Sequence, residues 1–171
     1  MSYVVTEAKS GGCRHLIDAY CGSGLFSLSA AEHFSSVTGI EISQMAVQAA
    51  QRNAVANDIR NVNFIWGKAQ TLFDEVKSLE DKASRETAVI IDPSRKGCDI
   101  SFLTQLLAYS PRKIVYVSCN PATQARDVVV LTSNDYVISR VTPFDMFPQT
   151  KHIECVITLT NKNYNEACGD Q

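Results

Sequence analysis

Short apolar runs with strand character alternate with helical segments along most of this 171-residue chain. Strands are predicted at residues 15–21, 37–42, 62–66, 88–91, 113–118, 136–141 and 153–159. Helices are predicted at residues 26–34, 44–56, 69–79, 100–109 and 123–131. Strands that alternate with helices build a parallel sheet with helices on both faces. The sequence therefore predicts one α/β domain, which the chain length also favours.

The last two predicted strands are joined without a helix between them. Parallel neighbours need a long crossover connection, usually a helix, so the last strand is expected to insert antiparallel. The predicted fold is thus a Rossmann-like, seven-stranded and mostly parallel sheet with the last strand antiparallel. Such a sheet is typical of class I S-adenosylmethionine-dependent methyltransferases and distinguishes them from nicotinamide-binding domains.

Composition excludes several classes of protein. No run of about 18 apolar residues occurs, so no membrane span is predicted. The six cysteines are scattered without a Cys-x-x-Cys pair, and no secretory signal is visible, which indicates reduced thiols in the cytoplasm or nucleus and no zinc site. The net charge of −2 indicates a surface that does not attract phosphates strongly.

A glycine turn, residues 22–24, follows the first strand. Gly22 and Gly24 allow a tight turn and a close approach of the backbone to a ligand. Glu41 ends the second strand, where a carboxylate accepts hydrogen bonds from ribose hydroxyls. Ser27 stands where a dinucleotide fingerprint has its third glycine, which weakens a nicotinamide or flavin interpretation. A plain strand-to-helix turn without a ligand is the alternative.

Three side chains that could take part in catalysis lie at the ends of later strands. Cys119 follows the strand at 113–118, Asp92 follows the strand at 88–91, and Glu154 is the second residue of the last strand. Ligands of open α/β sheets bind beyond the carboxyl ends of the strands, so a thiol nucleophile and a base can meet there. Each residue has a plainer alternative: a small buried thiol, a turn former and a solvated edge carboxylate, respectively.

Five segments, taken together and in order, resemble one family. They are Asp18-Ala19-Tyr20-Cys21-Gly22-Ser23-Gly24, Gly39-Ile40-Glu41, Asp92-Pro93-Ser94-Arg95-Lys96-Gly97, Ser118-Cys119-Asn120-Pro121-Ala122-Thr123 and Asp145-Met146-Phe147-Pro148-Gln149-Thr150-Lys151-His152-Ile153-Glu154. The chain resembles the catalytic domain of RNA uracil-5 C-methyltransferases of the tRNA (uracil-5-)-methyltransferase type. The last two segments are the most specific, and the glycine turn is the least.

The resemblance implies methylation of uracil carbon 5 in RNA, in the first place a tRNA. It implies that Cys119 adds to carbon 6 of the base and that Glu154 removes the proton from carbon 5. The target base must leave its stack to reach such a thiol.

The resemblance also implies S-adenosyl-L-methionine as the cofactor. Tyr20, Leu25 and Glu41 fall where the family contacts it, beside the glycine turn. Asp92 falls at the junction between cofactor and target base.

Two departures from the family pattern shape the domain prediction. Ser94 stands where the family usually has a proline, and only a short segment precedes the first strand. We expect residues 1–14 to be a remnant of an upstream segment, 15–160 a catalytic domain and 161–171 a polar tail. RNA is then expected to bind mainly through segments that are absent here.

Three other functions stay open at this point. An RNA cytosine-5 methyltransferase also uses a thiol after the fifth strand, but it typically has a second cysteine after the fourth. An amino-methyltransferase would place an aromatic residue near Asp92-Pro93, where Ser94 and Arg95 stand. A fragment that binds the cofactor without activity, or binds nothing, is the third.

Overall fold

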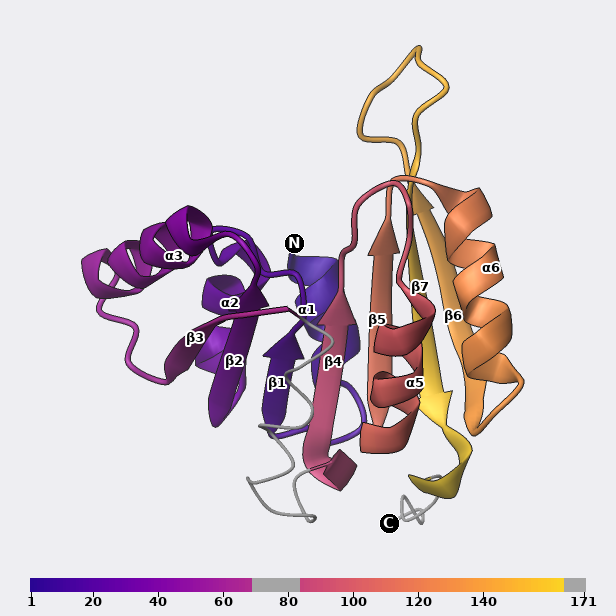
Figure 1. Cartoon of the computed structure of the whole chain (residues 1–171), viewed down its shortest axis with the longest axis horizontal. Coiled ribbons are helices and arrows are strands. Elements are labelled where there is room, and N and C mark those ends of the chain that lie inside the picture. Colours follow the sequence, from indigo (N-terminus) through magenta and orange to yellow (C-terminus); the bar gives the residue numbers. More distant parts are fainter. Residues whose placement is uncertain (69–83, 165–171) are drawn as a thin grey trace.

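The computed structural model describes residues 1–68 and 84–164. Within them, seven strands form one sheet in the order β3-β2-β1-β4-β5-β7-β6 (Figure 1). The strands are β1 His15–Asp18, β2 Ser36–Glu41, β3 Val62–Trp66, β4 Thr87–Ile91, β5 Lys113–Ser118, β6 Tyr136–Phe144 and β7 Glu154–Asn161. Strands β1 to β5 pair in parallel, whereas β7 lies antiparallel between β5 and β6. The predicted sheet with its antiparallel last strand is confirmed.

Helices cover both faces of the sheet (Figure 1). They are α1 Ser2–Lys9, α2 Leu25–Ala30, α3 Gln44–Ala56, α5 Ile100–Tyr109 and α6 Pro121–Thr132, with 3-10 turns η1 Ala31–His33, η2 Ser84–Glu86 and η3 Lys162–Tyr164. Apolar side chains of α5 and α6 pack on one face, and those of α1 and α2 pack on the other. In β4 the buried residues alternate between the two clusters, as the two-residue period of a strand requires.

Several element boundaries differ from those predicted. Strand β1 ends at Asp18, because the chain turns there toward the glycines. Helix α6 begins at Pro121, where the ring sits in the first turn and the Asn120 side chain accepts a hydrogen bond from the Ala122 amide at 3.2 Å. Strand β7 continues to Asn161, which is buried. The helix predicted at residues 69–79 lies outside the described residues.

Helix α1 occupies a segment for which no element was predicted. It buries Val4, Val5 and Ala8 against the sheet. The Tyr3 hydroxyl lies 2.6 Å from Thr142 Oγ1 on β6. This contact ties the start of the chain to the far edge of the sheet.

The carboxyl ends of four parallel strands define one edge of the sheet. Strand β1 ends at Asp18, β2 at Glu41, β4 at Ile91 and β5 at Ser118. Ligands bind at this edge in open α/β sheets. None of the helices in the described part of the chain is long and apolar enough to cross a membrane.

Candidate active site

The glycine turn depends on left-handed backbone at both glycines. Gly22 has φ +54° and Gly24 has φ +92°, a region that other residues rarely adopt. A Cβ on Gly24 would lie 3.0 Å from the Phe64 ring and 3.2 Å from Leu28, so the packing there is also tight. A Cβ on Gly22 would meet nothing within 4 Å. The turn is therefore packed against Phe64 and Leu28 at Gly24, whereas the space beside Gly22 is open.

Glu41 fastens this turn to the next helix. Its Oε2 accepts a hydrogen bond from the Gly22 amide at 3.1 Å, and its Oε1 accepts one from the Ser43 amide at 2.8 Å. A carboxylate has about four acceptor positions, so two positions remain for a ligand. Glu41 is partly exposed at the edge of the sheet, where ligand hydroxyls can reach it.

Asp18 is a fully buried carboxyl beneath the turn. Its Oδ2 accepts hydrogen bonds from the Ser27 amide at 2.9 Å and the Ser27 hydroxyl at 2.7 Å, whereas Oδ1 is buried without a partner. The pKa of Asp18 is raised to about 7, chiefly by burial and to a lesser degree by the charges of Asp92 and Glu41, against the lowering effect of the hydrogen bonds from Ser27. Ser27, which replaces the third glycine, thus holds this acid in place.

A cleft opens beyond the ends of β1, β2, β3 and β4. Its lining residues are Ala19, Tyr20, Ile40, Glu41, Ile42, Gly67, Lys68, Pro93, Ser94, Lys96, Gly97 and Asp99. Tyr20 and Glu41 are the two predicted cofactor residues among them. Tyr20 is held by an edge-to-face contact with Phe102, at 5.4 Å between ring centres.

Four predicted cofactor residues do not line this cleft: Gly22, Gly24, Leu25 and Asp92. Leu25 begins helix α2 and is 55% exposed. The loop after β4 supplies much of the cleft wall instead, and sequence analysis assigned it only Asp92 as a cofactor residue. Of the Arg95-Lys96 pair in this loop, Lys96 lines the cleft and Arg95 does not.

The antiparallel register of β5 and β7 brings the positions of the predicted thiol and base to the same end of the sheet. The β5–β7 ladder ends with the pair Ser118–Cys155. Cys119 follows Ser118 and Glu154 precedes Cys155, so the two residues are the next ones beyond that last pair. Both side chains are partly exposed. Sequence spacing alone did not show that they are neighbours, because 34 residues that include a helix and a strand separate the two positions.

Cys119 differs in its surroundings from the other described cysteines. Cys13, Cys21, Cys98 and Cys155 are buried, and burial raises the pKa of each of these thiols. They are thereby kept as neutral, unreactive side chains. Cys119 is partly exposed at the sheet edge and is the accessible thiol among the described residues.

Asp92 connects the thiol side of the site to the cofactor side. Burial and, to a lesser degree, the nearby charge of Glu154 together raise the pKa of Asp92 to about 6. The charge of Asp92 in turn acts on Asp18. Carboxyl groups therefore extend from the glycine turn to the thiol, and this part of the site favours a positively charged ligand. Among the described residues, no group of His, Cys, Asp and Glu could hold a metal ion.

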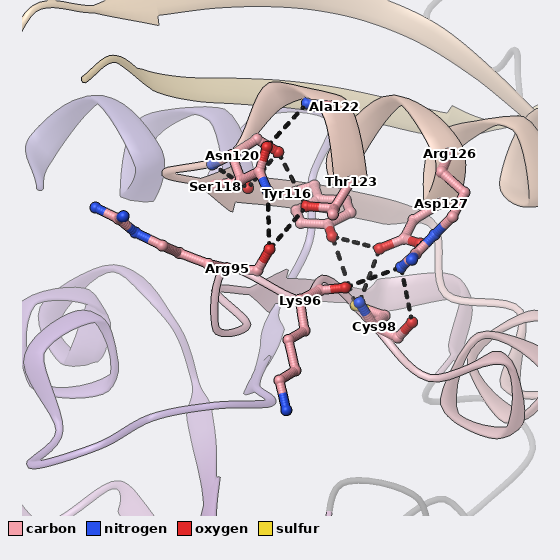
Figure 2. Close-up of polar contacts among 10 residues, drawn as sticks. All are labelled: Arg95, Lys96, Cys98, Tyr116, Ser118, Asn120, Ala122, Thr123, Arg126 and Asp127. Atoms are coloured by element: carbon pink, nitrogen blue, oxygen red, sulfur yellow. Dashed lines mark hydrogen bonds and ion pairs between the residues drawn. The ribbon is translucent and has the colours of Figure 1, made fainter. Parts of the chain in front are cut away.

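The residues around Cys119 are braced from both sides (Figure 2). The Asn120 amide donates to Ser118 Oγ at 3.0 Å, and the Asn120 side-chain amide donates to the Arg95 carbonyl at 2.9 Å. The turn that carries the thiol is thus joined to the loop after β4.

A profile of the tRNA (uracil-5-)-methyltransferase family matches residues 1–162. The chain belongs to this family. The resemblance found in the sequence motifs is thereby confirmed.

Two curated relatives are similar in sequence. The tRNA (uracil(54)-C(5))-methyltransferase of Schizosaccharomyces pombe is 49% identical over 151 residues, which cover 86% of this chain and 28% of that protein. The tRNA (uracil(54)-C(5))-methyltransferase of Saccharomyces cerevisiae is 49% identical over 151 residues, covering 85% of this chain and 23% of the relative. The chain thus spans about a quarter of the length of these relatives.

A solved structure shares the fold. The tRNA (uracil-54, C5)-methyltransferase of Pyrococcus abyssi, in complex with S-adenosyl-L-homocysteine, superposes with a TM-score of 0.74 at 31% identity. The match covers 92% of this chain and 37% of that one. The predicted class I methyltransferase fold is confirmed by this likeness.

Proposed function

We propose that this chain carries the catalytic segment of an S-adenosylmethionine-dependent enzyme that methylates carbon 5 of uracil in RNA. The observation that supports the proposal is the end of the β5–β7 ladder, where the accessible thiol of Cys119 and the carboxylate of Glu154 belong to the next residues beyond the pair Ser118–Cys155. The pair stands at the same sheet edge as the cleft lined by Tyr20 and Glu41. The names of the relatives make uracil 54 of a tRNA the first target to test.

The described residues fit S-adenosylmethionine, which carries a sulfonium and an ammonium group. Glu41 has free acceptor positions for ribose hydroxyls, and Gly22 leaves the turn open. The buried, unpartnered Asp18 Oδ1 and the nearby Asp92 form an acidic environment that suits a cation. When bound, the cofactor supplies a methyl group that its sulfonium charge makes electrophilic.

Cys119 is assigned the nucleophilic step. Carbon 5 of uracil is a poor nucleophile. Addition of the Cys119 thiolate to carbon 6 makes carbon 5 electron-rich. The bond from Sγ to carbon 6 forms as the ring double bond opens toward carbon 5. Carbon 5 then has the electron pair that the new methyl bond requires.

Glu154 is assigned the removal of the proton from carbon 5. After methylation, carbon 5 carries both its hydrogen and the methyl group. Glu154 accepts that proton, the double bond re-forms, and the bond from carbon 6 to Sγ breaks to release the thiolate. Asp92, whose pKa is raised in part by the charge of Glu154, is assigned a contact with the target base.

RNA binding by this chain alone is expected to be weak. The net charge is −2, and strong binding to RNA depends on cations that neutralise phosphates. The main RNA contacts are therefore assigned to segments outside this chain, as the greater length of the relatives allows.

The test compares two substitutions in two settings: the chain alone, and the chain inserted in place of the matching segment of the Schizosaccharomyces pombe relative. Cys119→Ala should abolish both methylation and the covalent protein–RNA adduct. Glu154→Gln should still add to the base and methylate it, but should accumulate an adduct that survives denaturant. Cys13→Ala removes a buried thiol far along the chain from the site and should leave turnover unchanged.

Three outcomes would contradict the proposal. Normal turnover by Cys119→Ala would make the thiol structural. Folded, active Glu154→Gln without an adduct would assign the base to another group. Methyl transfer to cytidine rather than uridine in matched transcripts would favour a cytosine-5 enzyme.

A further inference from the structure

The loop after β4, residues 92–99, is held by side chains of helix α6 (Figure 2). Asn120 and Thr123 donate to the Arg95 carbonyl, at 2.9 and 3.3 Å. One guanidinium nitrogen of Arg126 donates to the Lys96 carbonyl at 3.0 Å and lies 3.4 Å from the Cys98 carbonyl. Three successive parts of the loop backbone are thus fixed from one helix.

The residues that hold the loop occupy one face of α6 and its cap. Thr123 lies three residues after Asn120, and Arg126 and Asp127 lie three and four residues after Thr123, a spacing that gathers them on one side of the helix. We call this set the anchoring face of α6. It begins one residue after Cys119, so the helix that starts beside the thiol also fixes the loop.

Asp127 is the buried centre of the anchoring face, with 1% of its surface exposed. Its Oδ2 accepts hydrogen bonds from the Cys98 amide at 2.8 Å and the Tyr116 hydroxyl at 2.7 Å. Its Oδ1 accepts two from Arg126, from Nε at 2.9 Å and from a terminal nitrogen at 2.7 Å. A buried charge is tolerated only with such complete pairing, so the group has one well-defined geometry.

Gly97 shows how tightly this pair lies against the loop. Its φ is +76°, and a Cβ would lie 2.5 Å from Asp127 Oδ2 and 2.7 Å from Arg126. The glycine allows the backbone to pass directly over the ion pair. Lys96, Gly97 and Asp99, on either side of the contact, line the cofactor cleft.

We propose that Arg126 and Asp127 are positioning residues, which hold the cofactor-cleft wall at a fixed place relative to Cys119. Neither residue touches the assigned reacting atoms. They act through the loop backbone, which joins Asp92 at one end to Lys96, Gly97 and Asp99 at the other. This role rests on the proposed function, which assigns the cleft to the cofactor and the Cys119 thiol to the target uracil.

The decisive variant is Arg126→Gln. The Arg126 side chain is 58% exposed, so its loss should leave the fold intact. Loss of the two hydrogen bonds from Arg126 to Asp127 should speed amide exchange at Cys98 about tenfold. It should also weaken the binding of S-adenosyl-L-homocysteine, measured by calorimetry, by about the same factor. Arg126→Lys keeps the positive charge but lacks the planar set of guanidinium donors, so it should restore slow exchange and tight binding only in part. Arg60→Gln, which removes an exposed ion-paired arginine from another loop, should change neither.

Asp127→Asn provides a second measurement of the same inference. It keeps the shape of the side chain but removes the charge, so it should also speed exchange at Cys98 and raise the dissociation constant. Unchanged exchange and binding in both variants would overturn the proposal. Equal acceleration of the amides in β4 and β5 would also overturn it, because that pattern reports general destabilisation. A wild-type chain that binds no S-adenosyl-L-homocysteine would overturn the cofactor site, and exchange at Cys98 would then decide the anchoring separately.

Discussion

Replacing Asp18 with asparagine should make the ligand-free protein more stable above neutral pH. The carboxyl is fully buried, and one of its oxygens has no partner. Asparagine has the same shape, and its carbonyl oxygen can accept both hydrogen bonds from Ser27 that Oδ2 now accepts. The substitution therefore removes a buried charge while keeping the contacts.

The expected magnitude follows from the pKa of this carboxyl. Burial raises the pKa of Asp18 from 3.8 to about 7, so between these values the folded protein holds a proton that the unfolded chain has lost. Stability falls with rising pH wherever the folded state binds more protons. At about 1.4 kcal/mol per unit of pKa, Asp18 lowers the free energy of unfolding by about 4 kcal/mol between pH 4 and pH 8. The asparagine side chain does not titrate in this range, so the variant lacks this dependence.

Urea unfolding of the wild type and Asp18→Asn, measured at intervals from pH 5 to pH 8, checks this expectation. The difference in free energy of unfolding should grow in favour of the variant from pH 5 to about pH 7 and then level off toward pH 8. Asp135→Asn makes the same change of net charge at an exposed carboxyl and should give no comparable trend. A difference between wild type and Asp18→Asn that stays constant across this range would refute the argument.

Two further predictions concern the same sheet edge. Burial raises the pKa of Asp92 to about 6, and a cationic cofactor favours the anion of this carboxyl. The affinity for S-adenosylmethionine should therefore fall by up to about tenfold per pH unit below pH 6. Calorimetry in buffers of different ionisation enthalpy measures the proton uptake or release that accompanies binding. Flat affinity between pH 5 and pH 7 would contradict this. Gly39→Ala would bring a Cβ within 2.7 Å of the Phe64 ring and 2.8 Å of Ser27 Oγ, and should lower the free energy of unfolding by about 1–3 kcal/mol in urea. Unchanged stability would show that Phe64 can move aside.

Much of the fold could be predicted because each strand and helix has a local pattern. The alternation of elements, the antiparallel last strand and the position of Glu41 at the end of β2 all follow from such patterns. Helix α1 was missed because it has only eight residues, and its apolar positions become informative only against the sheet. Its stability comes from packing rather than from the local preference of its residues.

The arrangement of the site depended on contacts between distant segments. The spacing of Thr123, Arg126 and Asp127 is visible in the sequence, but an ordinary solvated helix face has the same spacing. Only the fold shows that the loop around Gly97 lies against this face. Likewise, Cys119 and Glu154 come to the same end of the sheet through the register of two strands that are not consecutive in the chain.

The missing third glycine illustrates how one local departure changes the whole site. Ser27 stands in its place and gives two hydrogen bonds to Asp18, and Gly39 on the next strand leaves the space that the Ser27 side chain needs. The three residues therefore act as one unit, which keeps an acid buried under the glycine turn. Ionisation of such an acid costs stability in the ligand-free protein, and an anionic ligand above it would raise that cost. The turn is thus better suited to a positively charged sulfonium cofactor than to the anionic pyrophosphate of a dinucleotide.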